Sequence, residues 1–324
     1  MYKLLEKFAI RHLGSNVLTI SELKISSLSI KKHLLITTKD NNLYLVSQFS
    51  NKDKLSFANF INTQTFLDKH RIRVPSVLAK DKRKLLFIQK YLGDLSLYKF
   101  VSSRDISSHD IVKIYQKVIN LLIDAQLIRD KSCIAFEKEF GLDRLIAEYN
   151  IFVKPYLIDN LWKNKLNKIQ KVEFKQFYQK LAQILAEVPK VFCFRDFQST
   201  NLILDKDSNV FVIDFQGARL AFPQYDLASL LEDNYIILSQ KARNLLLDYY
   251  MKEYQKKSGT KINVEEFKKI YRLATIQRKL HDLAIFVRAK VKENNDYFMK
   301  YIPENMARLT VLLQNEGLDF NLNS

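Results

Sequence analysis

The chain has 324 residues, of which 47% are hydrophobic and 12% aromatic, a composition that supplies a substantial core and excludes a disordered protein. This length favours two lobes or domains. The formal net charge of +17 leaves two interpretations open: a solvated lysine-rich surface, or a site that attracts polyanions such as nucleotide phosphates.

Membrane, secreted and zinc-binding classes are disfavoured by simple counts. No run of 18 apolar residues predicts a membrane span, and the N-terminus lacks the apolar core of a signal peptide. The two cysteines, Cys133 and Cys193, lie far apart and outside any C-x-x-C pattern, so neither a zinc site nor a disulfide framework is expected. We expect a cytoplasmic protein.

The first quarter of the chain is typical of a small β-rich unit with one helix. Alternating and β-branched residues predict strands over 23–38 and 41–49. Helical spacing follows over 57–67, and Pro75 must end that helix. Two apolar runs around a charged turn predict a hairpin over 77–92.

Beyond residue 95 the pattern becomes mainly helical. Ser107 and Ser108 can cap a helix whose apolar face repeats every 3.6 residues. Further helices are predicted over 143–158, 173–187, 226–233, 239–256, 264–292 and 303–315. A single β-region, 191–215, lies among them, and it contains a hairpin of two strands joined by a turn at 205–209. We therefore predict an α+β fold with a small lobe (1–92) and a larger helical lobe (93–324).

Three polar residues surround the predicted hairpin of this β-region. Asp196 precedes it, Asn201 begins its first strand and Asp214 ends its second. Because a hairpin brings those two ends together, Asn201 and Asp214 can direct oxygen atoms at one Mg²⁺, and Asp196 can accept a proton from an attacking hydroxyl. That arrangement suits phosphoryl transfer. The alternative is that these three residues have only the ordinary turn and capping roles of Asp and Asn.

A wider stretch, FRDFQSTNLILDKDSNVFVIDFQGARLAFPQYDLASLLEDNY, resembles the aminoglycoside phosphotransferase and choline kinase-like superfamily. Within it, the stretch is most similar to bacterial anomeric kinases of N-acetylmuramate and N-acetylglucosamine, with their H-R-D-F-x-S-x-N-L, I-D-F-Q-D-A and P-x-x-Y-D-L motifs. The resemblance extends to VPSVLAKD, to KYLGD and to QRKLHDLAIFVR, and it spans nearly the whole chain.

The resemblance implies a protein-kinase-like bilobal fold that uses ATP and Mg²⁺. It makes Asp196 the catalytic base and Asn201 and Asp214 the metal ligands. The implied structural supports are Phe194, Arg195 and Asp226. The implied nucleotide contacts are the hinge residues Lys90, Tyr91 and Leu92, together with Lys31 and Lys32. The substrate candidates are Glu148, Gln216, Asp233, Arg278 and Arg288; salt bridges to neighbouring helices are the alternative for the two arginines.

The chain departs from the family pattern at several places. Phe194 replaces a histidine before Arg-Asp, which favours a packing role. The front loop, aligned with SSLSIKKHLL, lacks its glycine, and no strand lysine occurs in LYLVSQF. Lys31 and Lys32 either reach the phosphates or belong to a solvent-facing strand pair. Gly217 stands where the family often has aspartate.

Three functional hypotheses follow. The first is a small-molecule kinase that acts on an amino sugar, with an aminoglycoside or another small alcohol as alternative acceptors. The second is a kinase-fold nucleotide-binding protein with little or no catalysis. The third is a nucleic-acid binder, which the charge alone suggests and which lacks any recognition motif. We expect a small-molecule partner, no specific nucleic acid, no membrane and a monomer.

Overall fold

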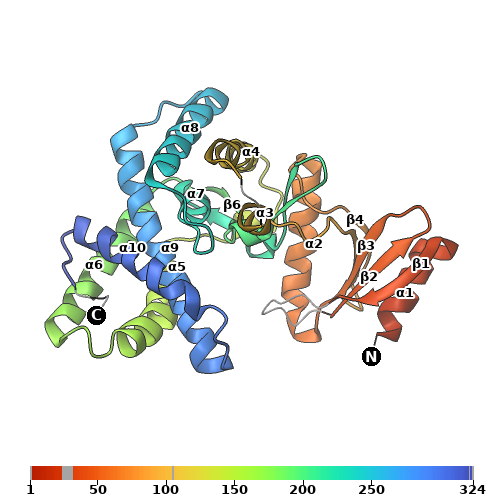
Figure 1. Cartoon of the computed structure of the whole chain (residues 1–324), viewed down its shortest axis with the longest axis horizontal. Helices are drawn as coiled ribbons and strands as arrows, with labels where there is room; N and C mark the ends of the chain where they lie inside the picture. Colours follow the sequence, from red (N-terminus) through yellow and green to blue (C-terminus); the bar gives the residue numbers. More distant parts are fainter. Residues whose placement is uncertain (1, 24–31, 104–105, 321, 323–324) are drawn as a thin grey trace.

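A computed structural model describes residues 2–23, 32–103, 106–320 and 322. A five-stranded antiparallel sheet with two helices forms the small lobe, and a mainly helical body forms the large one (Figure 1). The predicted α+β, bilobal fold class is therefore confirmed. The precise boundary at residue 92 stays a prediction.

The sheet of the small lobe has the strand order β1-β2-β3-β5-β4. Its strands are β1 (Val17–Glu22), β2 (Lys32–Thr38), β3 (Leu43–Gln48), β4 (Val77–Asp81) and β5 (Leu86–Lys90). Strands β4 and β5 are the predicted hairpin. Strand β1 lies ahead of the predicted first strand, and residues 24–31 fall outside the described part of the chain.

The two faces of this sheet are covered by different helices. Helix α1 (Lys3–Leu13) packs one face, where it joins Leu34, Ile36 and Val46 in a separate hydrophobic cluster. Helix α2 (Lys54–Lys69) lies on the other side of the sheet, between it and the large lobe (Figure 1). Because side chains alternate along a strand, each strand divides its residues between an α1 face and a large-lobe face.

Helix α1 was not predicted from the sequence. Its buried residues Leu5, Phe8 and Ala9 follow helical spacing, and Gly14 ends the helix with a φ of 60°. The predicted small lobe had one helix, so this part of the prediction was incomplete. Lys3, Glu6 and Lys7 occupy exposed or half-buried positions between the apolar residues, as in any amphipathic helix, so a local signal for α1 was present in the sequence.

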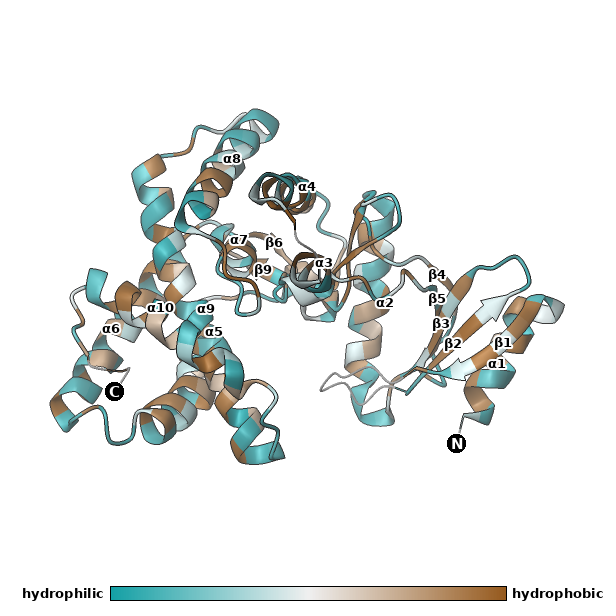
Figure 2. Cartoon of the chain, in the orientation of Figure 1, coloured by the Kyte–Doolittle hydropathy of each residue, from teal (hydrophilic) through white to brown (hydrophobic). Residues whose placement is uncertain are grey.

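The large lobe contains the predicted helices with shifted ends, together with α3 (Leu97–Ser102), which was not predicted. The predicted helices are α4 (Ser108–Gln126), α5 (Leu142–Glu148), α6 (Lys168–Glu187), α7 (Gln224–Leu231), α8 (Gln240–Ser258), α9 (Val264–Glu293) and α10 (Ile302–Asn315). Helix α5 continues as a π-helix over Tyr149–Leu161 that contains Pro155. Apolar residues of these helices form one buried core, and Figure 2 marks the hydrophobic segments along each ribbon.

Two small antiparallel pairs of strands interrupt these helices. Strands β7 (Leu202–Leu204) and β8 (Val210–Val212) form the predicted hairpin. Strand β6 (Val191–Cys193) pairs with β9 (Arg219–Ala221), a pair that was not predicted. In the part of the chain that the structure describes, no helix is both long and apolar enough to cross a bilayer.

Candidate active site

The segment Phe194–Asn201, called the catalytic loop below, is held at its start by Asp226 on α7. The Asp226 carboxylate accepts the backbone N–H groups of Phe194 at 2.6 Å and Arg195 at 3.0 Å. Asp226 is fully buried, and burial raises its pKa to about 7 while these two hydrogen bonds lower it. The loop is thus tied to the helix through its backbone, and not through the Arg195 side chain.

Asp233 holds the middle of the catalytic loop in the same way. One carboxylate oxygen accepts the N–H of Ser199 at 2.6 Å, and the other accepts the N–H of Tyr235 at 2.8 Å. Its side chain is buried. Both oxygens are engaged by the backbone, so we reassign Asp233 from the predicted substrate contact to support of the loop.

The structure brings Asp196, Asn201 and Asp214 together. The Asn201 side chain donates to the carbonyl of Asp196 at 3.0 Å, and the Asn201 carbonyl accepts the N–H of Ile213, the neighbour of Asp214. Asp214 itself has a left-handed backbone with a φ of 61°, and so has Arg195 with 77°. Such strained non-glycine residues persist only where their surroundings fix them, and they concentrate at functional sites.

The donor set of this site fits Mg²⁺. The Asn201 amide nitrogen is used by Asp196, which leaves the amide oxygen to act as a ligand. Gln216 donates to one Asp214 oxygen at 2.6 Å, and the other oxygen remains. Among the described residues no cluster of three or more His, Cys, Asp or Glu forms a closed metal cage. Two hard oxygen ligands suit a cation that completes its shell with water and phosphate oxygens.

Asp196 lies near both positively and negatively charged side chains. Desolvation raises its pKa, the nearby Arg195 and Arg278 lower it, and Asp214 raises it again. The net shift is upward, which makes the carboxylate a better proton acceptor than an exposed aspartate. Arg278 is buried on α9, where its guanidinium donates to the Tyr225 hydroxyl at 2.8 Å and to Asp282 at 2.7 Å.

Glu148, a predicted substrate residue, lies at the end of α5 in a buried ion-pair cluster. Its carboxylate contacts Arg144 at 2.7 Å and the imidazole of His281 on α9. Burial raises the pKa of Glu148, but these partners outweigh it and lower the pKa to about 2. Glu148 is therefore an ionised anchor between α5 and α9.

Two other predicted substrate residues, Gln216 and Arg288, lie in different surroundings. Gln216 is half-buried and donates a hydrogen bond to Asp214, one of the two residues expected to bind the metal. Arg288 is 38% exposed and pairs with Glu293 at 3.1 Å. It lies ten residues, about 15 Å, along α9 from the buried Arg278. Glu293 belongs to α9 itself, so this pair is not the expected salt bridge to a neighbouring helix, and the substrate role of Arg288 stays a prediction.

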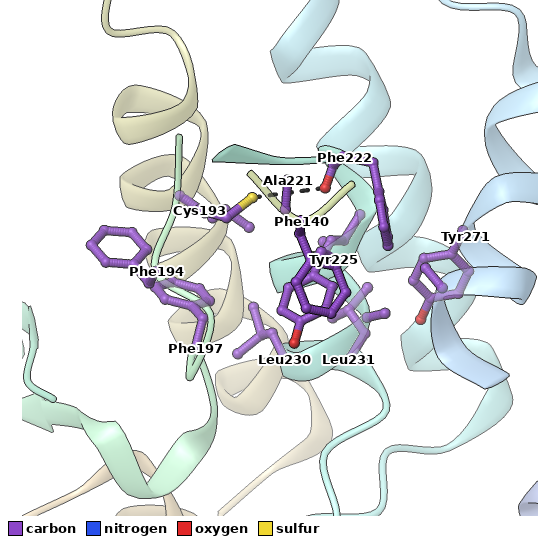
Figure 3. Close-up of a cluster of buried hydrophobic side chains, with 14 of the residues drawn as sticks. Phe140, Cys193, Phe194, Phe197, Ala221, Phe222, Tyr225, Leu230, Leu231 and Tyr271 are labelled. Carbon is purple, nitrogen blue, oxygen red and sulfur yellow. Dashed lines mark hydrogen bonds between the residues drawn. The ribbon is translucent and has the colours of Figure 1, made fainter. Parts of the chain in front are cut away.

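Phe194 packs beneath the catalytic loop. Its ring is buried, stacks on Phe197 at 5.1 Å and meets Phe192 edge-to-face at 5.3 Å. Figure 3 shows Phe194 and Phe197 next to each other beside Cys193. The hydrogen bond of a histidine is replaced here by aromatic contacts, each of which contributes about 0.5–1.5 kcal/mol beyond area burial.

The predicted hinge residues join the two lobes, but two of their N–H groups are already used. Lys90 donates its N–H to Ser76 and Tyr91 donates to Leu43, each at 2.9 Å. Neither of these two N–H groups is available to an adenine, whereas the hinge carbonyls can still accept hydrogen bonds, so the nucleotide role of the hinge stays a prediction. Within the described residues, the Leu92 N–H makes no such strand contact.

The same hinge residues line a cavity of about 640 Å³. Asp205, Lys206 and Asp207, which form the turn of the β7–β8 hairpin, line it as well. Because Asn201 and Asp214 flank the open end of that hairpin, this cavity lies at the opposite end of the hairpin from these two residues.

The front-loop predictions have unequal outcomes. Lys31 lies outside the described residues. Lys32 begins β2 and alternates with His33, so it shares a face with Leu34 and Ile36, the residues that pack against α1. Lys32 is therefore directed away from the large lobe, and the predicted phosphate contact is not supported by its position.

The sequence analysis missed several members of the buried network, namely Arg144, Tyr225, His281 and Asp282. A signal existed for the last two, because Arg278, His281 and Asp282 follow one another at helical spacing of three and four residues. Glu148, the ion-pair partner of His281, lies 133 residues away in the sequence (281 − 148), so its identity depends on the packing of the α5 end against α9.

The profile of the phosphotransferase enzyme family matches residues 30–260. The chain belongs to this family. It is therefore a kinase that acts on small molecules.

Two curated relatives carry a more specific name. The chain is 25% identical over 256 residues to an N-acetylmuramate/N-acetylglucosamine kinase of Neisseria meningitidis serogroup B, and the match covers 78% of this chain and 73% of that protein. An enzyme of the same name from Caulobacter vibrioides is 29% identical over 132 residues, which cover 40% of this chain and 35% of the relative.

Solved structures with similar folds include an aminoglycoside phosphotransferase with ADP bound and the choline kinase of Streptococcus pneumoniae. The first has a TM-score of 0.65 at 14% identity and covers 96% of this chain and 99% of that one. The second has a TM-score of 0.63 at 16% identity, with 95% and 98% covered. At these identities the likeness concerns the fold alone.

Proposed function

We propose that this kinase transfers the γ-phosphoryl group of ATP to a hydroxyl of an amino sugar such as N-acetylmuramate or N-acetylglucosamine. The curated relatives of that name support the acceptor class. The observation that carries the proposal is the geometry of three residues. Asp196 and Asn201 are joined by a hydrogen bond, and Asp214 follows the residue that bonds Asn201 across the hairpin.

In the proposed reaction the acceptor hydroxyl donates its proton to Asp196 as its oxygen bonds to the γ-phosphorus. The bond between that phosphorus and the β,γ-bridging oxygen breaks, and ADP leaves. Mg²⁺, when bound by Asn201 and Asp214, neutralises charge on the β- and γ-phosphates. The raised pKa of Asp196 favours proton acceptance. The hydrogen bonds that Asp226 and Asp233 accept from the loop backbone keep the base in place.

The direct test measures ADP release with N-acetylmuramate, N-acetylglucosamine and a panel of aminoglycosides, for the wild type and for Asp196→Asn. We expect turnover on an amino sugar and a loss of about 100-fold or more in kcat for the variant. The matched control is Asp207→Asn, which makes the same chemical change on the exposed hairpin turn. Equal rates for wild type and Asp196→Asn would overturn the mechanism, and turnover confined to aminoglycosides would overturn the acceptor class.

A further inference from the structure

The strand pair β6–β9 brings two arginines close to the proposed base. Arg219 begins β9 and pairs with Cys193 of β6, two residues before Arg195 in the catalytic loop. The Gly217 carbonyl accepts the Nε–H of Arg219 at 3.1 Å. A β-carbon at this glycine would lie 3.4 Å from Oδ2 of Asp196 and 3.6 Å from a guanidinium nitrogen of Arg195. Gly217 thus adjoins both guanidinium groups and the Asp196 carboxylate, and it has no side chain that could pair with either arginine.

Neither guanidinium group has an ion pair within the part of the chain that the structure describes, and the Nε of Arg195 is buried without a hydrogen-bond partner there. Burial lowers the pKa of Arg195, and the carboxylates of Asp196 and Glu148 raise it above its ordinary value. Glu148 is already paired with Arg144 at 2.7 Å, and Asp196 is the proposed base. Both nearby carboxylates are therefore committed to other roles, and an anion from outside the chain can neutralise the arginines.

Several positive charges lie close together at this place. Burial lowers the pKa of Arg219, and the nearby guanidinium groups of Arg195 and Arg144 lower it further. Burial and the charge of Arg219 also lower the pKa of Lys138, so this amine belongs to the same group of cations. Arginine side chains keep their protons at any physiological pH. Their mutual repulsion is relieved when an anion binds among them.

We propose that Arg195 and Arg219 bind a carboxylate of the acceptor, so that the enzyme prefers an acidic amino sugar to a neutral one. N-acetylmuramate carries a carboxylate that N-acetylglucosamine lacks, and the polycationic aminoglycosides would be repelled. Guanidinium groups suit this role because their planar N–H groups bind a carboxylate through paired hydrogen bonds. The position beside Asp196 lets one sugar present its hydroxyl to the base and its carboxylate to the arginines. The inference rests on the proposed amino-sugar kinase activity and names the acceptor class within it.

The test uses two sugars that differ only in the lactyl ether group. ADP-release assays would give kcat/KM for N-acetylmuramate and N-acetylglucosamine with the wild type, Arg219→Gln and Arg272→Gln. We expect the wild type to favour the acidic sugar by about 10-fold or more, and Arg219→Gln to lose about 10-fold to 100-fold in kcat/KM with the acidic sugar alone. Arg272→Gln is the matched control, because it removes the same charge from an exposed position of α9 that pairs with Glu316, and it should change neither value by more than about twofold.

The outcomes separate this inference from the proposed function. Equal losses with both sugars would overturn the inference, since Arg219 would then act on the loop or on the transferred phosphoryl group, and an unchanged kcat/KM with the acidic sugar would overturn it as well. Wild-type turnover of N-acetylglucosamine alone would overturn the inference and leave the proposed function intact, whereas turnover of neither sugar would overturn both. If Arg219→Gln fails to fold, Arg219→Lys replaces it, and a smaller loss confined to the acidic sugar is expected, because lysine keeps the charge without the planar donors.

Discussion

The two lobes differ in how they use buried charge. Among the described residues, His33 is the one buried Asp, Glu, Lys, Arg or His of the small lobe, which is an apolar sandwich of α1, the sheet and α2. The large lobe buries seven such side chains: Glu148, Asp226, Glu232, Asp233, Arg278, Lys279 and His281. Several of these side chains hold or surround the catalytic loop. The large lobe therefore fixes the positions of its polar groups through buried charge, whereas the small lobe is held mainly by apolar packing.

The largest expected effect concerns the metal ligand. Asp214→Asn removes a carboxylate from the proposed Mg²⁺ site, and we expect activity to fall by about 1000-fold with little change in unfolding free energy, because Asp214 is exposed. Asp207→Asn, at the other end of the same hairpin, should leave activity within about twofold. A small activity loss for Asp214→Asn would show that the hairpin does not carry the metal.

The aromatic contact between the lobes gives the next largest effect. Phe60→Ala removes the ring between Phe87 and Phe215. The cavity should lower the unfolding free energy by about 3–5 kcal/mol, and release of Phe215 should also lower kcat. Phe8→Ala, which removes a ring from the α1 face, serves as the control: it should lower stability but spare kcat in the folded fraction. Equal kcat losses in both variants would contradict the separation of the two faces.

Buried charge in the large lobe should also make stability depend on pH. Lys279 hydrogen-bonds Asn234 and Asn305, and burial lowers its pKa to about 8. Between pH 8 and about 10 the unfolded chain holds this proton and the folded chain does not. The unfolding free energy contributed by this group therefore rises with pH, by up to about 3 kcal/mol.

Lys279→Met isolates that contribution. Urea denaturation at several pH values should give a wild-type stability that rises, relative to the variant, from pH 8 to pH 10. The tyrosines and cysteines that titrate in the same pH range contribute equally to the stability of both proteins, so their contribution cancels in the comparison. Parallel pH profiles would mean that Lys279 titrates at its usual pKa.

The smallest expected effect on stability and activity concerns Asp226, whose carboxylate holds the start of the catalytic loop. Asp226→Asn replaces one acceptor oxygen by an amide group that faces a backbone N–H of Phe194 or Arg195. The unpaired donor should lower the unfolding free energy by about 2 kcal/mol and lower kcat through loss of loop order. Urea denaturation and ADP-release assays measure both quantities. Unchanged kcat would show that the loop keeps its geometry without the carboxylate.

The helices from α4 onward, the β4–β5 and β7–β8 hairpins and the central triad could be predicted from the sequence. Pro75, the turn at 205–209 and the helical periodicity beyond residue 107 are local signals, and each depends on residues close together in the chain. The placement of Asp196, Asn201 and Asp214 needs only a hairpin, so it too could be inferred. Helix α1 was missed although the spacing of Leu5, Phe8 and Ala9 is a local signal of the same kind.

The remaining features were decided by tertiary structure. Whether Lys32 or His33 is directed at the large lobe depends on which face of the sheet α1 covers, since a shift of one residue exchanges the two faces. Likewise, Asp233 was expected at the substrate and instead holds Ser199, because the end of α7 packs beneath the catalytic loop. Sequence patterns specify local geometry and chemistry, whereas the partner of a buried charge is set by elements that meet only in the folded chain.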